Sequence, residues 1–401
     1  MKNKRYRFTS RLGAFLSVFI PLQMSLADAA RANEEEMAQN SLDYFPLDEP
    51  AFELREPPVN LSDSPFLDLE SLAQDFVLGT KKMEIPGYPD AFNPSITRWR
   101  GSLLLSFRIY DRKAGTADKM GLVWLDDDFC QLGPPKILKV LVPDPLSLPK
   151  RQDPRLITVG DRLFIVYNNV LKGIVDRELR RMFVTELYYD GESFYSTTPS
   201  HLMNFEGVNN KRSEKNWVPF TYEDTLLLGY SISPHRILRP LIGTNTCENY
   251  ATSQGPIKWK WGTLRGGTPA LLDGDHYLAF FHSSDALPTV HSMGKKIPHY
   301  FMGAYTFSSR PPFTITAISP EPIVGRNFYH GLLYKTWKPL HVVFPGGFVF
   351  DDRYIWIVYG RQDHEVWIVK LDKKGLLRSL VPVVPDSIKD GDSMAVNTPR
   401  P

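Results

Sequence analysis

Residues 153–168 read DPRLITVGDRLFIVYN and contain the pattern that decides the fold. A proline lies near the start of a short apolar stretch, a turn of Gly and charged residues follows, and a second apolar run comes next. This second run is rich in β-branched and aromatic residues, which favour strands, whereas Gly beside Asp favours a turn. The stretch therefore predicts a β-hairpin.

The same pattern occurs five times along the chain. The prolines of the five copies lie 50 to 76 residues apart and are Pro94, Pro154, Pro219, Pro269 and Pro345. A hairpin repeated at such intervals is typical of a β-propeller, in which each blade is a small antiparallel sheet beside a central channel. We therefore expect an all-β chain that folds as a five-bladed β-propeller, with polar residues at the strand ends pointing into one shared funnel.

The chain has 401 residues and divides into four predicted parts. Residues 1–30 combine a basic start, an apolar run and a small-residue cleavage motif, which is the pattern of a signal peptide; an uncleaved anchor is the alternative. Residues 31–85 predict an extended N-terminal arm with one short helix near residues 69–76, residues 86–375 the propeller, and residues 376–401 a loose C-terminal tail. We expect an exported protein with no membrane span after signal cleavage.

The charges of the chain nearly cancel, with 47 basic against 45 acidic residues and a formal net charge of +2. This balance gives no electrostatic reason to expect a nucleic acid or an anionic membrane as the main partner. Cys130 and Cys247 are the two cysteines. Export would permit a disulfide between them, but their separation in sequence favours two independent buried thiols. Cys and His do not occur at metal-ligand spacing, so we expect no metal and no cofactor.

The second repeat contains the first candidate for chemistry, Asp153, which precedes Pro154. A proline restricts the residue before it to extended geometry, which would place this carboxylate at the mouth of the funnel. A carboxylic acid in that position could act as the general acid for a glycosidic oxygen. The alternative is a turn aspartate that caps backbone amides, with Arg155 in a surface ion pair.

Three functional side chains precede the third strand, namely Lys215, Asn216 and Trp217. Lysine can bind phosphate or a hydroxyl group, asparagine can hydrogen-bond sugar hydroxyls, and tryptophan can stack on the face of a sugar. The alternative is a charged loop whose tryptophan fills the hydrophobic core.

The last two repeats also carry polar residues near their strands. Arg265 precedes two glycines that would let a ligand approach the backbone, and guanidinium suits phosphate or carboxylate. His282 ends one apolar run, and Asp363 follows another. Taken singly, each has a structural alternative: a β-bulge, a satisfied core histidine and a turn aspartate. Taken together, they predict a polar site inside the funnel.

These motifs, in this order, resemble those of the β-mannoside phosphorylases and hydrolases of glycoside hydrolase family 130 and the related β-1,2-mannosyltransferases. The matching segments read QDPR at 152–155, KNWVPF at 215–220, RGGTP at 265–269 with His282, and PGG at 345–347 with YGRQD at 359–363. The resemblance covers roughly residues 86–375. Gln152 stands where the family has glutamate.

The resemblance implies an enzyme that cleaves β-mannosidic linkages of an oligosaccharide or glycoconjugate with inversion, by hydrolysis or phosphorolysis. Asp153 would be the general acid, its proton passing through a sugar hydroxyl, and the sugar would lie over Asp363 and Asn93. Inorganic phosphate would be a co-substrate. The further substrate-binding residues would be Arg108, Arg155, Asn216, Trp217 and His282, and those binding phosphate or the leaving group would be Lys215, Arg265 and His235.

Two other functions remain open at this point. The same scaffold could transfer mannose from a donor to an acceptor, or it could bind glycans without catalysis. Hydrolysis would also require a base to activate water, and Glu214 is the nearest candidate in sequence.

Overall fold

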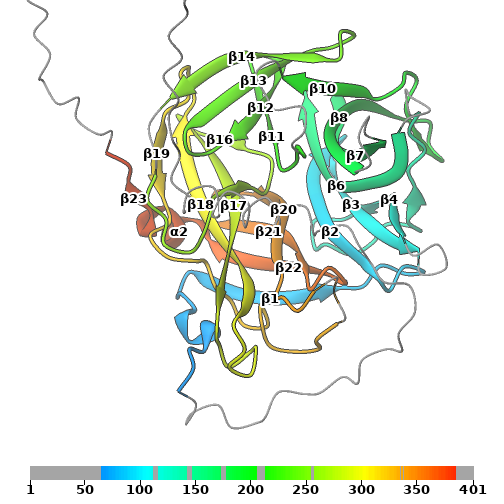
Figure 1. Ribbon diagram of the computed structural model, residues 1–401. Coiled ribbons are helices and arrows are strands. Elements are labelled where there is room, and N and C mark those ends of the chain that lie inside the picture. Colours follow the sequence, from blue (N-terminus) through cyan, green and yellow to red (C-terminus); the bar gives the residue numbers. More distant parts are fainter. Residues whose placement is uncertain are drawn as a thin grey trace, which may run out of the picture. The chain divides into compact units, whose positions relative to one another are not determined.

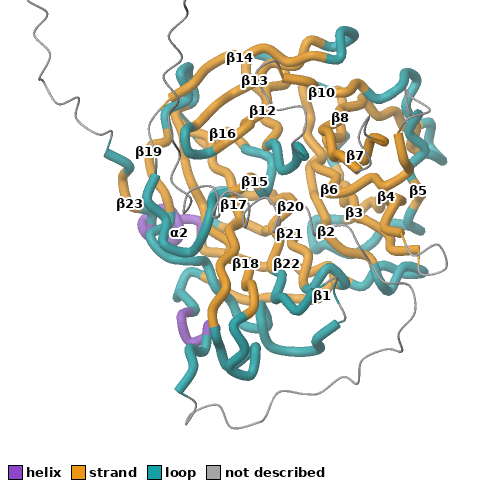
Figure 2. The backbone as a smooth tube through the Cα atoms, in the orientation of Figure 1, coloured by secondary structure: helices purple, strands orange, loops and turns teal. Residues whose placement is uncertain are grey.

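The computed structural model describes residues 65–111, 116–141, 147–172, 178–205, 213–253, 257–334, 336 and 338–384, all of which belong to one compact unit of the chain. The predicted signal peptide, residues 1–30, lies outside the described residues. No helix among the described residues combines the length and apolar character needed to cross a bilayer. The described chain is nearly all β, as Figure 2 shows, which confirms the predicted class.

The strands form four hydrogen-bonded sheets (Figure 1). One contains β2 (Ala91–Trp99), β3 (Ser102–Asp111), β4 (Thr116–Leu125) and β5 (Lys136–Ile137) in that order. The largest contains β6 (Ser147–Val159), β7 (Arg162–Lys172), β8 (Glu178–Tyr189), β9 (Phe194–Tyr195), β10 (His201–Phe205), β11 (Val218–Tyr222), β12 (Thr225–Ser231), β13 (His235–Leu241) and β14 (Thr246–Ser253). Its two antiparallel halves, β6–β10 and β11–β14, are joined by a short parallel pairing of β10 with β14.

The other two sheets bring together both ends of the described chain. One contains β15 (Arg265–Gly266), β16 (Leu271–Asp273), β17 (His276–Leu287), β18 (Ile297–Ser308), β19 (Ile315–Ile318) and β23 (Val381–Pro382). The last has the order β1–β22–β21–β20, formed by β1 (Val77–Met83), β20 (Val343–Phe350), β21 (Tyr354–Arg361) and β22 (Glu365–Asp372). Two short helices accompany them, η2 (Leu69–Leu72) and α2 (Lys373–Ser379).

The five predicted hairpins are all formed, as β2–β3, β6–β7, β11–β12, β16–β17 and β20–β21. Three repeat prolines, Pro94, Pro154 and Pro345, lie where the strand register shifts. Proline has no backbone N–H to donate, and a β-bulge is one of the few strand positions that tolerates this loss. The bulges also turn the preceding residues, so Asn93 has φ 45° and Asp153 has φ 53°. The expectation of extended geometry at Asp153 is therefore wrong.

Each group of neighbouring strands contacts the next group along the chain, and the last group contacts the first. Strand β2 contacts β6 and β20, β6 contacts β11, β12 contacts β15, and β17 contacts β20. Large clusters of buried apolar side chains lie between successive groups, for example the cluster shared by β6–β8 and β12–β14. Burial of these apolar faces is the main stabilising contribution. The arrangement brings the first strands of successive groups next to one another.

Both ends of the predicted propeller need correction. The sequence places residues 77–83 in the arm, but they pair with β22 as strand β1, so the sheets begin before residue 86. The predicted short helix is present as the 3-10 helix at 69–72, which Asp68 caps by accepting from the Glu70 amide. Residues 376–384 are not a loose tail, because α2 ends at residue 379 and β23 pairs with β19.

The two cysteines are both free, Cys130 exposed and Cys247 buried. The prediction of two independent thiols is confirmed, but the prediction that both are buried is wrong for Cys130.

Candidate active site

Asp153 is held by donors from three different strands. Its Oδ1 accepts from Asn93 Nδ2 at 3.1 Å and from Arg108 Nη1 at 3.0 Å. Its Oδ2 accepts from Asn168 Nδ2 at 3.1 Å. Only 8% of the residue is exposed. This aspartate is thus a buried meeting point of β2, β3, β6 and β7 rather than a turn residue on the surface.

The surroundings of Asp153 stabilise its ionised form. Burial on its own would raise the pKa of this carboxyl, but the positive charges of Arg108, Arg155 and Lys215, with the hydrogen bond from Asn93, lower the pKa to about 2. Opposite charges and hydrogen bonds to a carboxylate both favour the charged form. In the unliganded protein Asp153 is therefore an anion at neutral pH.

A second carboxyl, Asp363, shares two of these neighbours. It lies just after β21 with φ 52°. Burial and the negative charge of Asp153 raise the pKa of Asp363 above its usual value, although Arg108 and a hydrogen bond from Asn93 act in the opposite direction. Two carboxyl groups with pKa values moved apart in this way are the usual sign of an acid and base pair.

Two residues of this network were not identified from the sequence. Asn168, on β7, accepts from Arg180 Nη1 at 3.1 Å while it donates to Asp153, and both residues are buried. Asn168 ends the apolar run of its repeat, at the same position as Arg108 and His282 in theirs. This shared position is the sequence signal that marks Asn168 as a candidate site residue. Arg180 lies on strand β8, outside the five hairpin repeats.

Arg155 connects three parts of the site. Its Nε donates to Gly267 O at 2.6 Å, and its Nη2 donates to Asn216 Oδ1 at 3.3 Å and Gly266 O at 3.4 Å. The residue is 1% exposed, and burial lowers the pKa of its guanidinium to about 10. It therefore positions β15 and Asn216 against β6. The alternative of a surface ion pair is wrong.

A group of basic side chains lies beside Asp153. The pKa of the buried His282 is held well below its usual value. Burial is the largest cause, and the positive charges of Arg265, Arg155 and Lys215 add to it. Arg265 pairs with His282 across β15 and β17. Burial and the positive charge of Arg265 also lower the pKa of Lys338, a neighbour that lies outside the repeated motifs. This concentration of positive charge suits an anionic ligand.

The sugar-stacking role expected for Trp217 is wrong. The side chain is 1% exposed and packs edge-on against Tyr230, with ring centroids 5.3 Å apart. Its indole N–H donates to Glu214 Oε2 at 3.2 Å. Trp217 instead fills the hydrophobic core between two groups of strands, which is the alternative that its sequence context offers. The proposed base Glu214 is buried in the same contact.

The phosphate-binding role expected for His235 is also wrong. This residue is 1% exposed on β13, and its Nδ1 lies 2.7 Å from Phe313 O. Its ring packs against Tyr305 and Phe307. Burial lowers the pKa of the imidazole to about 4, so it is neutral. A neutral histidine enclosed by aromatic rings offers nothing to phosphate.

No protein-family model and no curated protein matches the chain. Solved structures do match it. A "putative glycoside hydrolase" from Parabacteroides distasonis has a TM-score of 0.52 at 15% identity, over 84% of this chain and 99% of that one. A mannose phosphorylase from Leishmania mexicana, solved with a phosphate ion, has a TM-score of 0.51 at 12% identity, over 79% of this chain and 94% of that one.

Identities this low establish likeness of fold and not of activity. The matches nevertheless extend over most of the chain and nearly the full length of both structures. The chain is therefore similar in fold to this "putative glycoside hydrolase" and to this mannose phosphorylase, which confirms at the level of the fold the family resemblance that its motifs indicate.

Proposed function

We propose that this protein is an exported enzyme that breaks or forms β-mannosidic linkages at the site around Asp153. The observation that carries the proposal is the pair of carboxyl groups of the buried Asp153 and the half-buried Asp363, with pKa values shifted in opposite directions beside Asn93 and Arg108. Glycoside chemistry requires a positioned carboxyl group for proton transfer. The mannose phosphorylase with a similar fold supports the choice of sugar. Export rests on the basic and apolar residues 1–30.

The five antiparallel groups of strands support a five-bladed propeller. The nine-stranded sheet divides naturally at its short parallel pairing, which leaves groups led by β2, β6, β11, β15 and β20. Strand β1 would complete the last blade. The site residues then come from the first or second strands of the blades, or from the residues next to them, which is where a propeller places the side chains around its channel.

Phosphorolysis fits the site better than hydrolysis. Phosphate carries its own nucleophilic oxygen, whereas water needs a base, and Glu214 is buried against the indole of Trp217. Phosphate bound by Lys215 and Arg265 would also offset the positive charge that lowers the pKa of Asp153. The pKa would then rise, and Asp153 could hold the proton that the leaving oxygen requires.

Synthesis of the linkage is the second candidate, and the low pKa of Asp153 favours it. An ionised carboxylate is ready to accept a proton from the hydroxyl of an acceptor sugar, with mannose 1-phosphate as the donor. The same residue serves both directions, because a group that donates a proton in one direction accepts it in the other. The direction used depends on the concentrations of the substrates.

The test is a two-way assay of the full chain. β-Mannosides are incubated with and without phosphate, and mannose 1-phosphate is incubated with and without mannose or mannobiose acceptors. We expect mannose 1-phosphate to be released only when phosphate is present, and β-mannosides to form in the reverse reaction. Release of free mannose independent of phosphate would contradict phosphorolysis. Glycan binding without turnover in any arm would contradict the enzyme proposal.

Gly360→Ala is expected to reduce this activity by displacing Asn93. A Cβ on residue 360 would lie 2.2 Å from Asn93 Oδ1 and 2.9 Å from Asn93 N. Asn93 cannot then keep its hydrogen bond to Asp153, and a misplacement of this size costs on the order of 10²-fold in rate. Gly79→Ala is the control, because nothing lies within 4 Å of a Cβ there. Equal rates for the two variants would show that the position of Asn93 is not critical.

A further inference from the structure

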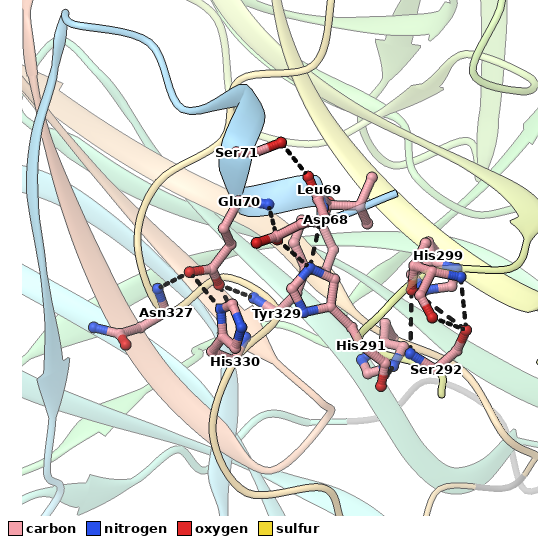
Figure 3. A network of polar contacts seen from close by, with 12 residues as sticks. Asp68, Leu69, Glu70, Ser71, His291, Ser292, His299, Asn327, Tyr329 and His330 are labelled. Atoms are coloured by element: carbon pink, nitrogen blue, oxygen red, sulfur yellow. Dashed lines mark hydrogen bonds and ion pairs between the residues drawn. The ribbon is translucent and has the colours of Figure 1, made fainter. Parts of the chain in front are cut away.

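Two histidines and a carboxylate, far apart in sequence, meet beside the segment that precedes β1 (Figure 3). Asp68, His291 and His330 each present one ligand atom, and these atoms lie within 4.8 Å of one another. Within this cluster, His291 Nε2 lies 3.0 Å from Asp68 Oδ1. None of these residues belongs to the network around Asp153.

His291 presents Nε2 to this cluster. Nε2 lies 3.1 Å from the backbone N of Leu69, which donates to it, and 3.0 Å from Asp68 Oδ1. The imidazole side chain is 1% exposed and the Asp68 side chain is 33% exposed, so solvent reaches the carboxylate side of the cluster. With the proton on Nδ1, Nε2 carries the lone pair that a metal requires, and a metal ion bound there would take it in place of the Leu69 N–H.

His330 is oriented by a carboxylate in the way that metal-bound histidines usually are. Its Nδ1 lies 2.8 Å from Glu70 Oε2, which leaves Nε2 as the atom available to a metal. Glu70 is itself fixed, because backbone amides of Asn327, Tyr329 and His330 donate to its two oxygens at 3.1, 2.8 and 2.9 Å. A carboxylate on the second ring nitrogen fixes the tautomer and makes the first a better ligand.

We propose that Asp68, His291 and His330 bind one Zn²⁺ ion. Two imidazoles and one carboxylate are a ligand set that suits zinc, with water completing four-coordination. Zinc–ligand bonds of about 2.0–2.1 Å separate neighbouring ligand atoms by about 3.3 Å, which modest side-chain rotations reach from the observed spacing. The sequence alone does not predict this metal site, because residues 68, 291 and 330 share no local motif.

The ion would join three segments at the place where the first strand meets the last sheet. Asp68 precedes β1, His291 lies between β17 and β18, and His330 lies between β19 and β20. The backbone already connects two of these segments, through a bridge between Leu67 and Thr289. Because β1 pairs with β22, a metal here would hold in place the strand that completes the last sheet.

The experiment is zinc titration of the full chain after chelator treatment, followed by calorimetry and thermal unfolding. We expect one Zn²⁺ per chain and a higher Tm with zinc, and we expect His330→Gln to weaken binding at least 100-fold. The control is His276→Gln, since His276 also contacts an aspartate, Asp275, at 3.1 Å but is not part of the cluster. It should bind zinc as the wild type does.

Asp68→Asn provides a second variant in case His330→Gln does not fold, and it too should lose zinc affinity. Cobalt substitution gives an independent readout, because four-coordinate Co²⁺ with nitrogen and oxygen ligands absorbs strongly in the visible range. Absence of zinc binding by the wild-type protein would overturn the proposal. Zinc binding of wild-type affinity in His330→Gln and Asp68→Asn would overturn it equally.

Discussion

Asp153→Asn is expected to lower turnover of β-mannosides by roughly 10²- to 10⁴-fold, the contribution typical of a positioned proton-transfer group. Asparagine keeps the shape of the side chain but can neither hold nor accept the proton. The measurement is the rate of mannose 1-phosphate release with saturating phosphate, together with circular dichroism to show that the variant is folded. Unchanged turnover would remove Asp153 from the chemistry.

Asp363→Asn is the matched comparison, since Asp363 is the carboxyl with the raised pKa. Both variants are assayed on a mannoside with a dinitrophenyl leaving group, which departs without being protonated. If Asp153 is the acid, its variant recovers activity on this substrate and the Asp363 variant does not. Recovery by the Asp363 variant alone would assign the acid to Asp363.

Arg155→Met is expected to destabilise the protein by about 3–5 kcal/mol, as breaking a buried charged pair does. The change leaves the carbonyls of Gly266 and Gly267 without their donor and removes a positive charge that lowers the pKa of Asp153. Urea unfolding monitored by tryptophan fluorescence gives the free energy of unfolding. The large effect follows from complete burial, since the guanidinium cannot be replaced by water.

Arg162→Met is the control for this prediction. Arg162 lies on the neighbouring strand and pairs with Glu186 at 2.6 Å, but its side chain is 59% exposed. Exposed ion pairs contribute less than about 1 kcal/mol. Equal losses for the two variants would contradict the positioning role of Arg155.

Much of the fold could be predicted from the sequence, because the hairpin signal is local. Proline, turn and apolar run are read within a few residues, so all five hairpins were found. The pairing of β1 with β22 was missed, since it joins residues almost 300 positions apart. Nothing in residues 77–83 indicates which distant strand they pair with.

The sequence could predict that residues next to the repeat turns lie close together, but not which side chains the packing of neighbouring strands would bury. Asp153, Lys215 and Asp363 lie near bulges and strand ends that the repeats mark. Trp217 and His235 have the residue types expected of a sugar site, but neighbouring strands bury them. The role of Asn168 could not be predicted, because the pairing register of β6 with β7 is what places this residue beside Asp153.

The most direct measurement of the central claim is a crystal structure of the protein soaked with mannose and phosphate. We predict that the sugar lies against Asp153, Asp363 and Asn93, with phosphate between the sugar and the side chains of Lys215 and Arg265. Sugar and phosphate bound elsewhere on the molecule, with Asp153 touching neither, would contradict a mannoside-processing site at this position.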